Sequence, residues 1–192
     1  MHSELCMSLR AVKARSFDMS LKSSSTRYGT MAIAIHWTTA LAVILTFAAG
    51  LTLANTGPSP GLLIAHIVLG DLVFLLTLLR LVWWWVADKR PALPADQPRW
   101  QQLAAHAVHA AFYVIIILMA TSGITTILLS GAIPALLAGA PLPDFNGLIP
   151  RVAHGIMSRI LLLLFVLHVG AALYHQFVRR DQLLARMGVG RA

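Results

Sequence analysis

Residues 153–178 read AHGIMSRILLLLFVLHVGAALYHQFV, and this stretch decides the class of fold. It carries one charged side chain, Arg159, and about 20 consecutive apolar residues are enough for a helix to cross a bilayer. Three more stretches of this kind precede it, at 31–54, 62–86 and 103–130. The sequence therefore predicts an all-α integral membrane protein built as a bundle of four transmembrane helices.

The composition leaves little room for any other part. Hydrophobic residues make up 58% of the chain and charged residues 11%, whereas about a quarter of the residues are charged in an ordinary soluble domain. We expect one four-span domain at 28–192, preceded by a basic, serine-bearing, disordered cytoplasmic tail at 1–27. Cys6 is the one cysteine, so there is no disulfide framework and no C-x-x-C-H motif for covalent haem.

The distribution of positive charge predicts the orientation. Thirteen of the fifteen Lys and Arg residues lie in the two tails or around the loop between the second and third spans. Cytoplasmic loops of membrane proteins are rich in Lys and Arg, which places both termini in the cytoplasm. Topology accounts for the formal charge of +8, and nucleic acid is not expected as a partner.

Histidines are unusually frequent in the predicted spans. Ionisable side chains within a membrane are rare and are usually functional. One such histidine would more often be a packing residue, but seven across four helices favour a shared role. The seven are His36, His66, His106, His109, His154, His168 and His175.

The depths of these histidines predict two stacked sites. His154 and His168 are 14 residues apart, which is roughly 21 Å along a helix and within about 40° of the same face. His66 lies near the depth of His154, toward the outside, and His36 lies in the same half as His168. Each site would then hold two imidazoles from facing helices. On depth alone, either histidine of the third span could replace His36.

Haem suits such paired histidines better than the other groups considered. Structural zinc favours four ligands that include thiolates or carboxylates, and proton relays do not need matched pairs at two depths. Two axial imidazoles across a flat apolar ring are a common way to hold haem. Small residues that could make room for the ring lie near the histidines: Gly70, Gly155, Gly170, Ala171 and Ala172. We therefore expect two haem b groups held without covalent links.

Several motifs carry a resemblance to a known family. They are the pair His36-Trp37, LIAHIVLG at 63–70, AHAVH at 105–109, RVAHGIMSR at 151–159 and LHVGAALYH at 167–175. In order and spacing, over about 28–190, they resemble the bacterial cytochrome b561 family. The resemblance implies a di-haem, multi-pass electron carrier of the bacterial inner membrane. It also implies the axial ligand pairs His36 with His168 for the inner haem, and His66 with His154 for the outer haem.

The family's use of quinone suggests roles for further histidines. His175 lies two turns beyond His168 and is a candidate for binding ubiquinone or a similar quinone, or for transferring a proton to it; an interfacial structural role is the alternative. His109 and His106 could contact haem propionates or transfer protons, or they could simply face water. The family is associated with superoxide oxidation coupled to quinone reduction, and Arg151 could attract such an anion on the periplasmic side.

Other functions and one further contact follow from the same sequence. The expected partners are membrane lipid, quinone, and a small periplasmic donor or a redox partner protein. One alternative is a haem-bearing membrane anchor subunit of a larger dehydrogenase or hydrogenase. Another is a histidine-lined transporter of protons or metal. Asp71 and Arg159 each follow an outer histidine by five residues, so we expect them to lie at one depth and to form an ion pair; contact of Arg159 with a haem propionate is the alternative.

Overall fold

Four long helices form the body of the computed structural model, which describes residues 20–92 and 97–190. Each is long and apolar enough to cross a membrane, and the described ranges contain no strand. The helices are α2 (Thr30–Thr56), α3 (Pro60–Val86), α4 (Arg99–Ser130) and α6 (Ile149–Tyr174). The predicted all-α bundle with four membrane-spanning helices is confirmed. Residues 1–19 of the expected tail fall outside the described part of the chain.

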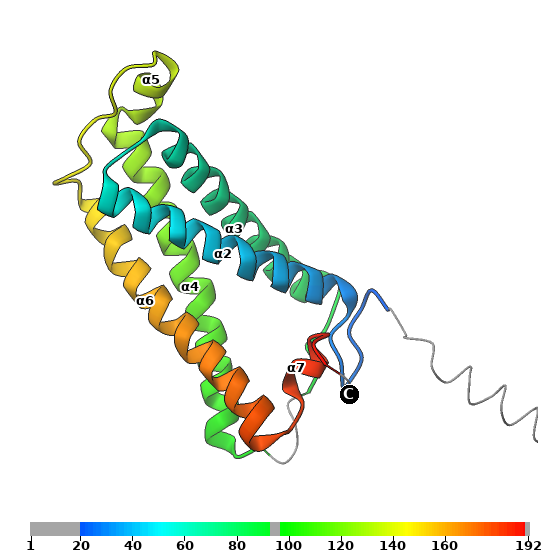
Figure 1. The fold of residues 1–192 in the computed structure, drawn as a ribbon. Helices are drawn as coiled ribbons and strands as arrows, with labels where there is room; N and C mark the ends of the chain where they lie inside the picture. The colour runs from blue at the N-terminus through cyan, green and yellow to red at the C-terminus, as the bar shows by residue number, and fades with distance from the viewer. Residues whose placement is uncertain (1–19, 93–96, 191–192) are drawn as a thin grey trace, which may run out of the picture.

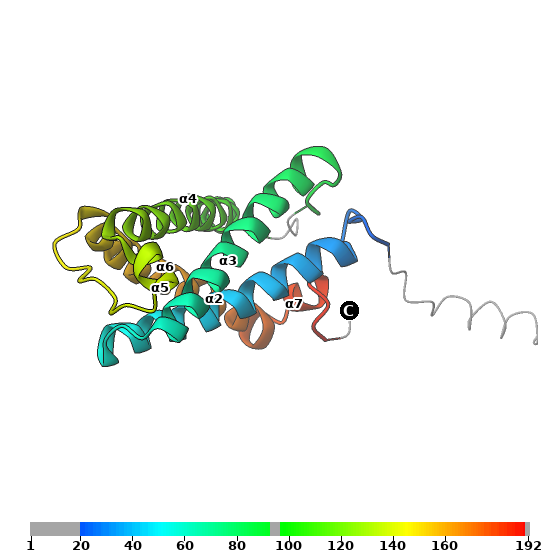
Figure 2. The ribbon, with the colours of Figure 1, turned by 90° about the horizontal axis from the view of Figure 1, so that it is seen from above.

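The four helices are arranged as two antiparallel hairpins. α2 packs closely on α3, and α4 packs closely on α6 (Figure 1). Seen from above, the two hairpins cross obliquely, and the closest packing between them is that of α3 against α4 (Figure 2). We call the end where α2 begins the inner end and the end where α6 begins the outer end. That the inner end faces the cytoplasm stays a prediction.

Shorter elements complete the two ends of the bundle. At the outer end, α5 (Ala132–Leu137) follows α4 directly, because Gly131 adopts a left-handed conformation with φ 76° that ends the longer helix. At the inner end, α6 continues into a π-helical turn, η1 (His175–Arg179), and then into α7 (Leu183–Arg186). Isolated π-helical turns are rare and often mark functional sites.

The buried centre of the bundle is a thin layer to which each long helix contributes one side chain. Its members are Ala42, Val73, Ile116 and Leu161. Leu161 lies seven residues from both His154 and His168, and a spacing of seven returns to nearly the same face of a helix. The apolar layer therefore separates an outer level of histidines from an inner one.

A buried carboxylate ties the first described residues to the end of α3. Asp88 accepts hydrogen bonds from the backbone and hydroxyl of Ser23, at 3.0 and 2.8 Å, and from the indole of Trp83 at 3.2 Å. Burial of this carboxyl acts to raise its pKa, but the hydrogen bonds from Ser23, Lys89 and Trp83 outweigh that effect and hold the pKa below its usual value. Asp88 therefore stays ionised at neutral pH and holds Ser23 against the end of α3.

The last described residues form a second tie at the inner end. The guanidinium of Arg186 donates to the carbonyls of Thr26 and Ala92, at 2.7 and 2.6 Å. The indole of Trp37, which follows His36 in the sequence, donates to the carbonyl of Met187 at 3.0 Å. The segment after α6 is thereby fixed under the inner end of α2.

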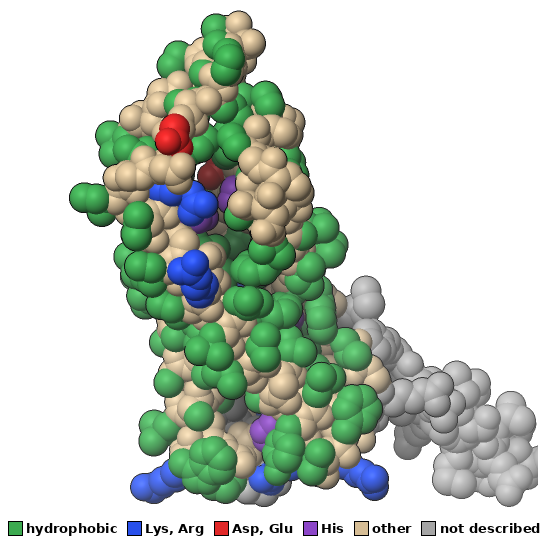
Figure 3. Space-filling model, turned by 60° about the vertical axis from the view of Figure 1, so that its left-hand side comes forward, with side chains coloured by type: hydrophobic (Ala, Val, Ile, Leu, Met, Phe, Trp, Pro, Cys, Tyr) green, Lys and Arg blue, Asp and Glu red, His purple; other side chains and the backbone are tan. Residues whose placement is uncertain are grey.

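The outer surface of the molecule has the character expected in a bilayer. Hydrophobic side chains cover the body, and Lys and Arg side chains gather at the inner end, which is the lower end of Figure 3. Trp85 is 89% exposed where α3 reaches this end. Tryptophan is common at the interface between lipid and water.

Candidate functional site

The two outer histidines face one another across the bundle. The rings of His66 on α3 and His154 on α6 have centroids 6.0 Å apart and are inclined by 74°. His66 Nδ1 lies 3.0 Å from the carbonyl of Thr46, and His154 Nδ1 lies 3.0 Å from the carbonyl of Met119. A carbonyl can only accept, so each Nδ1 donates its proton and each Nε2 keeps a free lone pair. Both rings are thus oriented as metal-ligating histidines usually are.

Each outer ring also packs on a glycine of its hairpin partner. A Cβ added to Gly50 would lie 2.8 Å from Cε1 of His66, and one added to Gly123 would lie 3.2 Å from Cε1 of His154. Gly50 lies four residues after Thr46, and Gly123 lies four residues after Met119. Four residues are about one helical turn, so each histidine meets the carbonyl and the glycine on one side of the neighbouring helix. The α2–α3 and α4–α6 hairpins therefore repeat one arrangement of carbonyl, glycine and histidine. Neither glycine was predicted from the sequence.

Three histidine rings meet at the inner level. His36 on α2 and His168 on α6 have ring centroids 6.3 Å apart, inclined by 66°, and His109 on α4 is 5.5 Å from His168. His109 Nδ1 lies 2.7 Å from the carbonyl of Ala105 in its own helix. His106 is exposed, which agrees with the alternative that it faces water.

A partly buried arginine is part of the inner level and was not predicted from the sequence. Arg80 follows Val73 by seven residues, so α3 carries a guanidinium at the level where α6 carries His168. Its Nη1 lies 3.0 Å from Nδ1 of His36, and its Nε is buried without a hydrogen-bond partner among the described residues. Arginine can only donate, so Nδ1 of His36 accepts and its ring proton lies on Nε2, the reverse of the outer histidines. Iron could bind Nε2 of His36 only once that proton has left. The inner histidine therefore faces a cation where the outer histidines face neutral carbonyls.

The spacing of the rings fits a metal ion held between two imidazoles. Metal–nitrogen bonds of about 2.0 Å, with about 1.1 Å from each nitrogen to its ring centre, place two such rings about 6.2 Å apart. The outer pair and the pair His36–His168 lie at 6.0 and 6.3 Å, whereas His109–His168 is closer, at 5.5 Å. The described residues contain no group of three or more His, Cys, Asp or Glu side chains suited to a metal. The geometry thus favours two separate two-imidazole sites.

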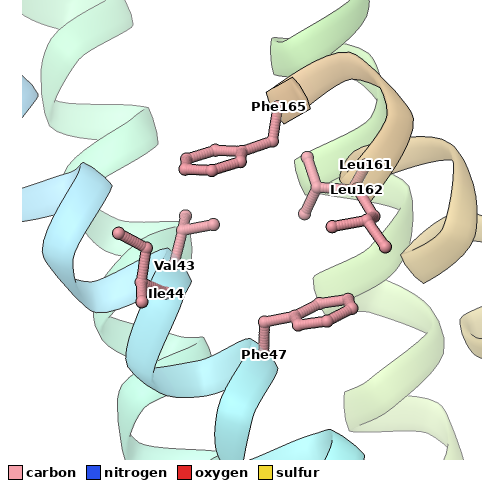
Figure 4. Close-up of a pocket in the computed structure, with 6 residues that line it drawn as sticks. All are labelled: Val43, Ile44, Phe47, Leu161, Leu162 and Phe165. Carbon is pink, nitrogen blue, oxygen red and sulfur yellow. The ribbon is translucent and has the colours of Figure 1, made fainter. Parts of the chain in front are cut away.

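An apolar cavity lies between α2 and α6. It has a volume of about 140 Å³, and Figure 4 shows Phe47 and Phe165 at opposite ends of it. Phe165 is three residues from His168, and Phe47 is three residues from Gly50, so the cavity connects the inner and outer levels. Its full lining is Val43, Ile44, Phe47, Leu161, Leu162 and Phe165. It offers a water-excluding environment for a flat apolar group.

His175 is paired with an acid at the inner end. Its Nδ1 lies 2.5 Å from Oδ2 of Asp181, and the two side chains are 14% and 11% exposed. The same carboxylate oxygen lies 3.6 Å from Nε of Arg179, and Oδ1 of Asp181 is buried without a hydrogen-bond partner in the described part of the chain. The η1 turn between α6 and α7 brings the acid back against the histidine. His175 was a candidate from the sequence for quinone binding or proton transfer, whereas Asp181 was not predicted.

The expected ion pair between Asp71 and Arg159 does not form. Both side chains are exposed, and neither has an ionic partner within 4.0 Å among the described residues. Five residues along a helix turn the side chain by about 140°, so each charge points away from the face that carries His66 or His154. The prediction of equal depth was reasonable, but the prediction of a contact was wrong because it ignored this rotation.

The small residues expected beside the histidines differ in their surroundings. Gly170 is exposed, and a Cβ added to it would have nothing within 4 Å. It follows His168 by two residues, about 200° around the helix, and therefore points away from the inner pair. Ala172, four residues after His168, is partly buried on the same side as that histidine. Gly155 lies beside Arg151, and Gly70 beside Thr46.

Comparisons with known proteins agree with this arrangement. A family model described as prokaryotic cytochrome b561 matches residues 27–190. Cytochrome b561 homolog 2 of Escherichia coli (strain K12) is 29% identical over 186 residues, covering 88% of this chain and 95% of that protein. Cytochrome b561 homolog 1 of the same organism is 29% identical over 174 residues, covering 84% and 96%. No solved structure matches the chain.

Proposed function

Because the chain belongs to the prokaryotic cytochrome b561 family, and is thus a multi-pass haem b electron-transfer protein of the bacterial inner membrane, we propose that it holds two haems. His66 and His154 bind the outer iron, and His36 and His168 bind the inner iron. Electrons pass singly between a donor at the outer end and membrane quinone at the inner end. The observation that supports this proposal is the presence of two similar imidazole pairs, whose ring centroids lie 6.0 Å apart at the outer level and 6.3 Å apart at the inner level.

Haem b supplies a one-electron couple, and the chain determines what that couple can do. Two histidines would hold each haem iron and would leave it no open position, which would favour electron transfer over oxygen chemistry at iron. The carbonyls of Thr46 and Met119 fix the outer ligands, and the apolar walls with Phe47 and Phe165 exclude water between the two levels. Fixed ligands and a dry interior keep the reorganisation that accompanies each electron small.

We place the quinone beside His175. Reduction of a quinone to a quinol consumes two electrons and two protons, and His175 lies seven residues beyond the inner ligand His168, toward the inner end. Asp181 orients the imidazole by holding Nδ1, which leaves Nε2 to meet the quinone oxygen and pass on a proton taken from the inner aqueous side. Superoxide is a candidate donor, and Arg151 near the outer end provides a positive charge that would attract it.

The haem content of the purified protein tests the proposal. We expect a reduced-minus-oxidised spectrum typical of low-spin haem b, and two haems per chain when haem and protein are both quantified. The two should titrate as separate one-electron steps, because their ligands have different neighbours. Protein that is folded and helical in detergent but carries no haem would contradict the proposal and would favour the histidine-lined transporter.

Arg80 should raise the reduction potential of the inner haem above that of the outer haem. A cation beside an axial ligand stabilises the electron-rich reduced state, and a partly buried charge contributes on the order of 1–2 kcal/mol. With 59 mV for each tenfold change in a one-electron equilibrium, Arg80→Gln should lower the inner potential by roughly 40–90 mV. Potentiometric titration measures this shift, and Arg80→Lys, which keeps the charge, is the matched control. An unchanged inner potential in Arg80→Gln would contradict the assigned role.

Loss of either member of the pair His175–Asp181 should slow quinone reduction without changing haem content. We expect His175→Asn and Asp181→Asn to lower the rate at which a soluble short-chain quinone oxidises the reduced protein by at least tenfold, because proton delivery fails. Stopped-flow absorbance of the haems measures this rate, and His106→Asn, at an exposed histidine, is the control. Equal rates in all three variants would place the quinone elsewhere.

A further inference from the structure

Two opposite charges, Asp71 and Arg159, lie in the middle of the membrane-spanning body with no ion-pair partner among the described residues. Asp71 follows Pro60 by eleven residues and Arg159 follows Ile149 by ten, so they lie roughly 16 and 15 Å from the outer ends of α3 and α6. Both are exposed, and neither forms an ion pair within the described residues. Figure 3 shows basic side chains well above the basic inner end, and acidic and histidine side chains lie beside the upper of them.

The surfaces around these two charges are apolar. On α3, Asp71 shares its outward face with Ile64, Leu75 and Val82, which are 49%, 61% and 52% exposed. On α6, Arg159 shares its outward face with Val152, Leu163 and Val166, which are 57%, 59% and 57% exposed. Each charge is therefore set in a stripe of side chains that would otherwise suit lipid.

A charge in such a stripe needs a partner. Charged side chains within a bilayer are costly and usually pair with one another, and the carboxylate of Asp71 is too short to reach either aqueous surface. Arg159 does not serve within the same chain, because the two side chains form no ion pair and their helices, α3 and α6, belong to different hairpins. The sign and depth of the two charges are nevertheless complementary.

We propose that α3 of one copy of this chain packs against α6 of a second copy, with Asp71 of the first paired to Arg159 of the second. The contact is head to tail, since it joins two different surfaces, and it closes into a ring or continues as a row. It is independent of the haem assignment, because both stripes lie on the faces opposite to the histidines.

Mixing two variants tests the pairing directly. Full-length chains with Asp71→Asn and Arg159→Gln, carrying different tags, are expressed separately or together and solubilised in lipid nanodiscs or mild detergent. Each alone should lose most of its self-association, whereas the two together should co-purify, because one intact pair forms between Arg159 of the first and Asp71 of the second. Equal co-purification in every combination, or a monomeric unmodified protein, would overturn the proposal.

A crosslinking experiment keeps the two native charges. In a Cys6→Ser background, Leu75→Cys and Leu163→Cys lie one turn below each charge, on the two stripes. Oxidation of membranes that contain both variants should give a mixed dimer, and Leu118→Cys on α4, 49% exposed at a similar depth, should not crosslink with either. Equal crosslinking of all three positions, or none for the pair of Leu75→Cys and Leu163→Cys, would contradict this interface. Haem per chain is measured alongside, so that a folding defect is recognised.

Discussion

A His66→Ala variant is expected to retain one haem per chain instead of two and to lose the outer spectral and redox component. Its methyl group cannot ligate iron, and the remaining imidazole of His154 then offers only one axial ligand. The inner site should persist, because the apolar layer with Val73 and Leu161 separates the two levels. Haem quantified per chain and a potentiometric titration measure the result.

The reciprocal variant should show the reciprocal loss. His168→Ala should keep the outer haem and lose the inner one, so that each variant retains the component that the other lacks. His106→Ala is the matched control, because its ring is exposed and its Nδ1 lies 2.7 Å from the carbonyl of Gln102 in its own helix. Loss of the same component in His66→Ala and His168→Ala would refute two separate sites.

A second comparison decides which ring is the partner of His168. We expect His36→Ala to lose the inner haem, whereas His109→Ala should retain it with a shifted potential. The reason is that His36 lies at 6.3 Å from His168, the spacing of two metal-bound imidazoles, while His109 at 5.5 Å leaves less room. Retention of the inner haem in His36→Ala and its loss in His109→Ala would reverse the assignment.

A methyl group at Gly50 is expected to remove most of the outer haem. A Cβ there would lie 2.8 Å from Cε1 of His66, closer than real Cβ contacts, and 3.2 Å from its Nδ1, so the ring must shift against its hydrogen bond to Thr46. Changes that disturb the groups orienting a ligand typically cost 10–100-fold in metal affinity. We therefore expect Gly50→Ala to lower the affinity for the outer haem at least tenfold, measured by haem retention on dilution.

Two further glycines make this experiment specific. Gly123→Ala should act in the same direction but less strongly, because its Cβ would lie 3.2 Å from Cε1 of His154 and the ring has to move less. Gly61→Ala on α3 is the control, since a Cβ there meets nothing within 4 Å while the change in helix propensity is similar. Outer-haem loss of equal size in Gly61→Ala would show a general effect on the bundle and not one on the ligand.

Much of the fold and part of the site could be predicted from the sequence because they depend on length and depth. A run of apolar residues fixes where a helix crosses the bilayer, and the rise per residue fixes how deep each histidine lies. These two rules predicted the four spans and placed His66 beside His154. They could not choose between His36 and His109, since both lie near His168 and the choice depends on distances of a few tenths of an ångström.

The remaining features depend on how neighbouring helices are rotated and where their backbones touch. Gly50 and Gly123 have no signal of their own in a span that contains other small residues; their role comes from a ring on another helix. Asp181 meets His175 only because the π-helical turn redirects the chain. The outward direction of Asp71, by contrast, could have been worked out from its five-residue offset.

The division of the bundle into two hairpins has a consequence for how the protein is assembled. Within the part of the chain that the structure describes, packing is close inside each hairpin and weaker between them. Each proposed iron takes one ligand from the α2–α3 hairpin and one from α6. The metal would therefore link two hairpins that pack only weakly on each other. Because binding energy of this kind is also folding energy, cofactor supply would decide whether newly inserted chains mature. In a haem-starved cell, the two hairpins would remain separable, and the chain would be exposed to the proteases that clear unassembled membrane proteins.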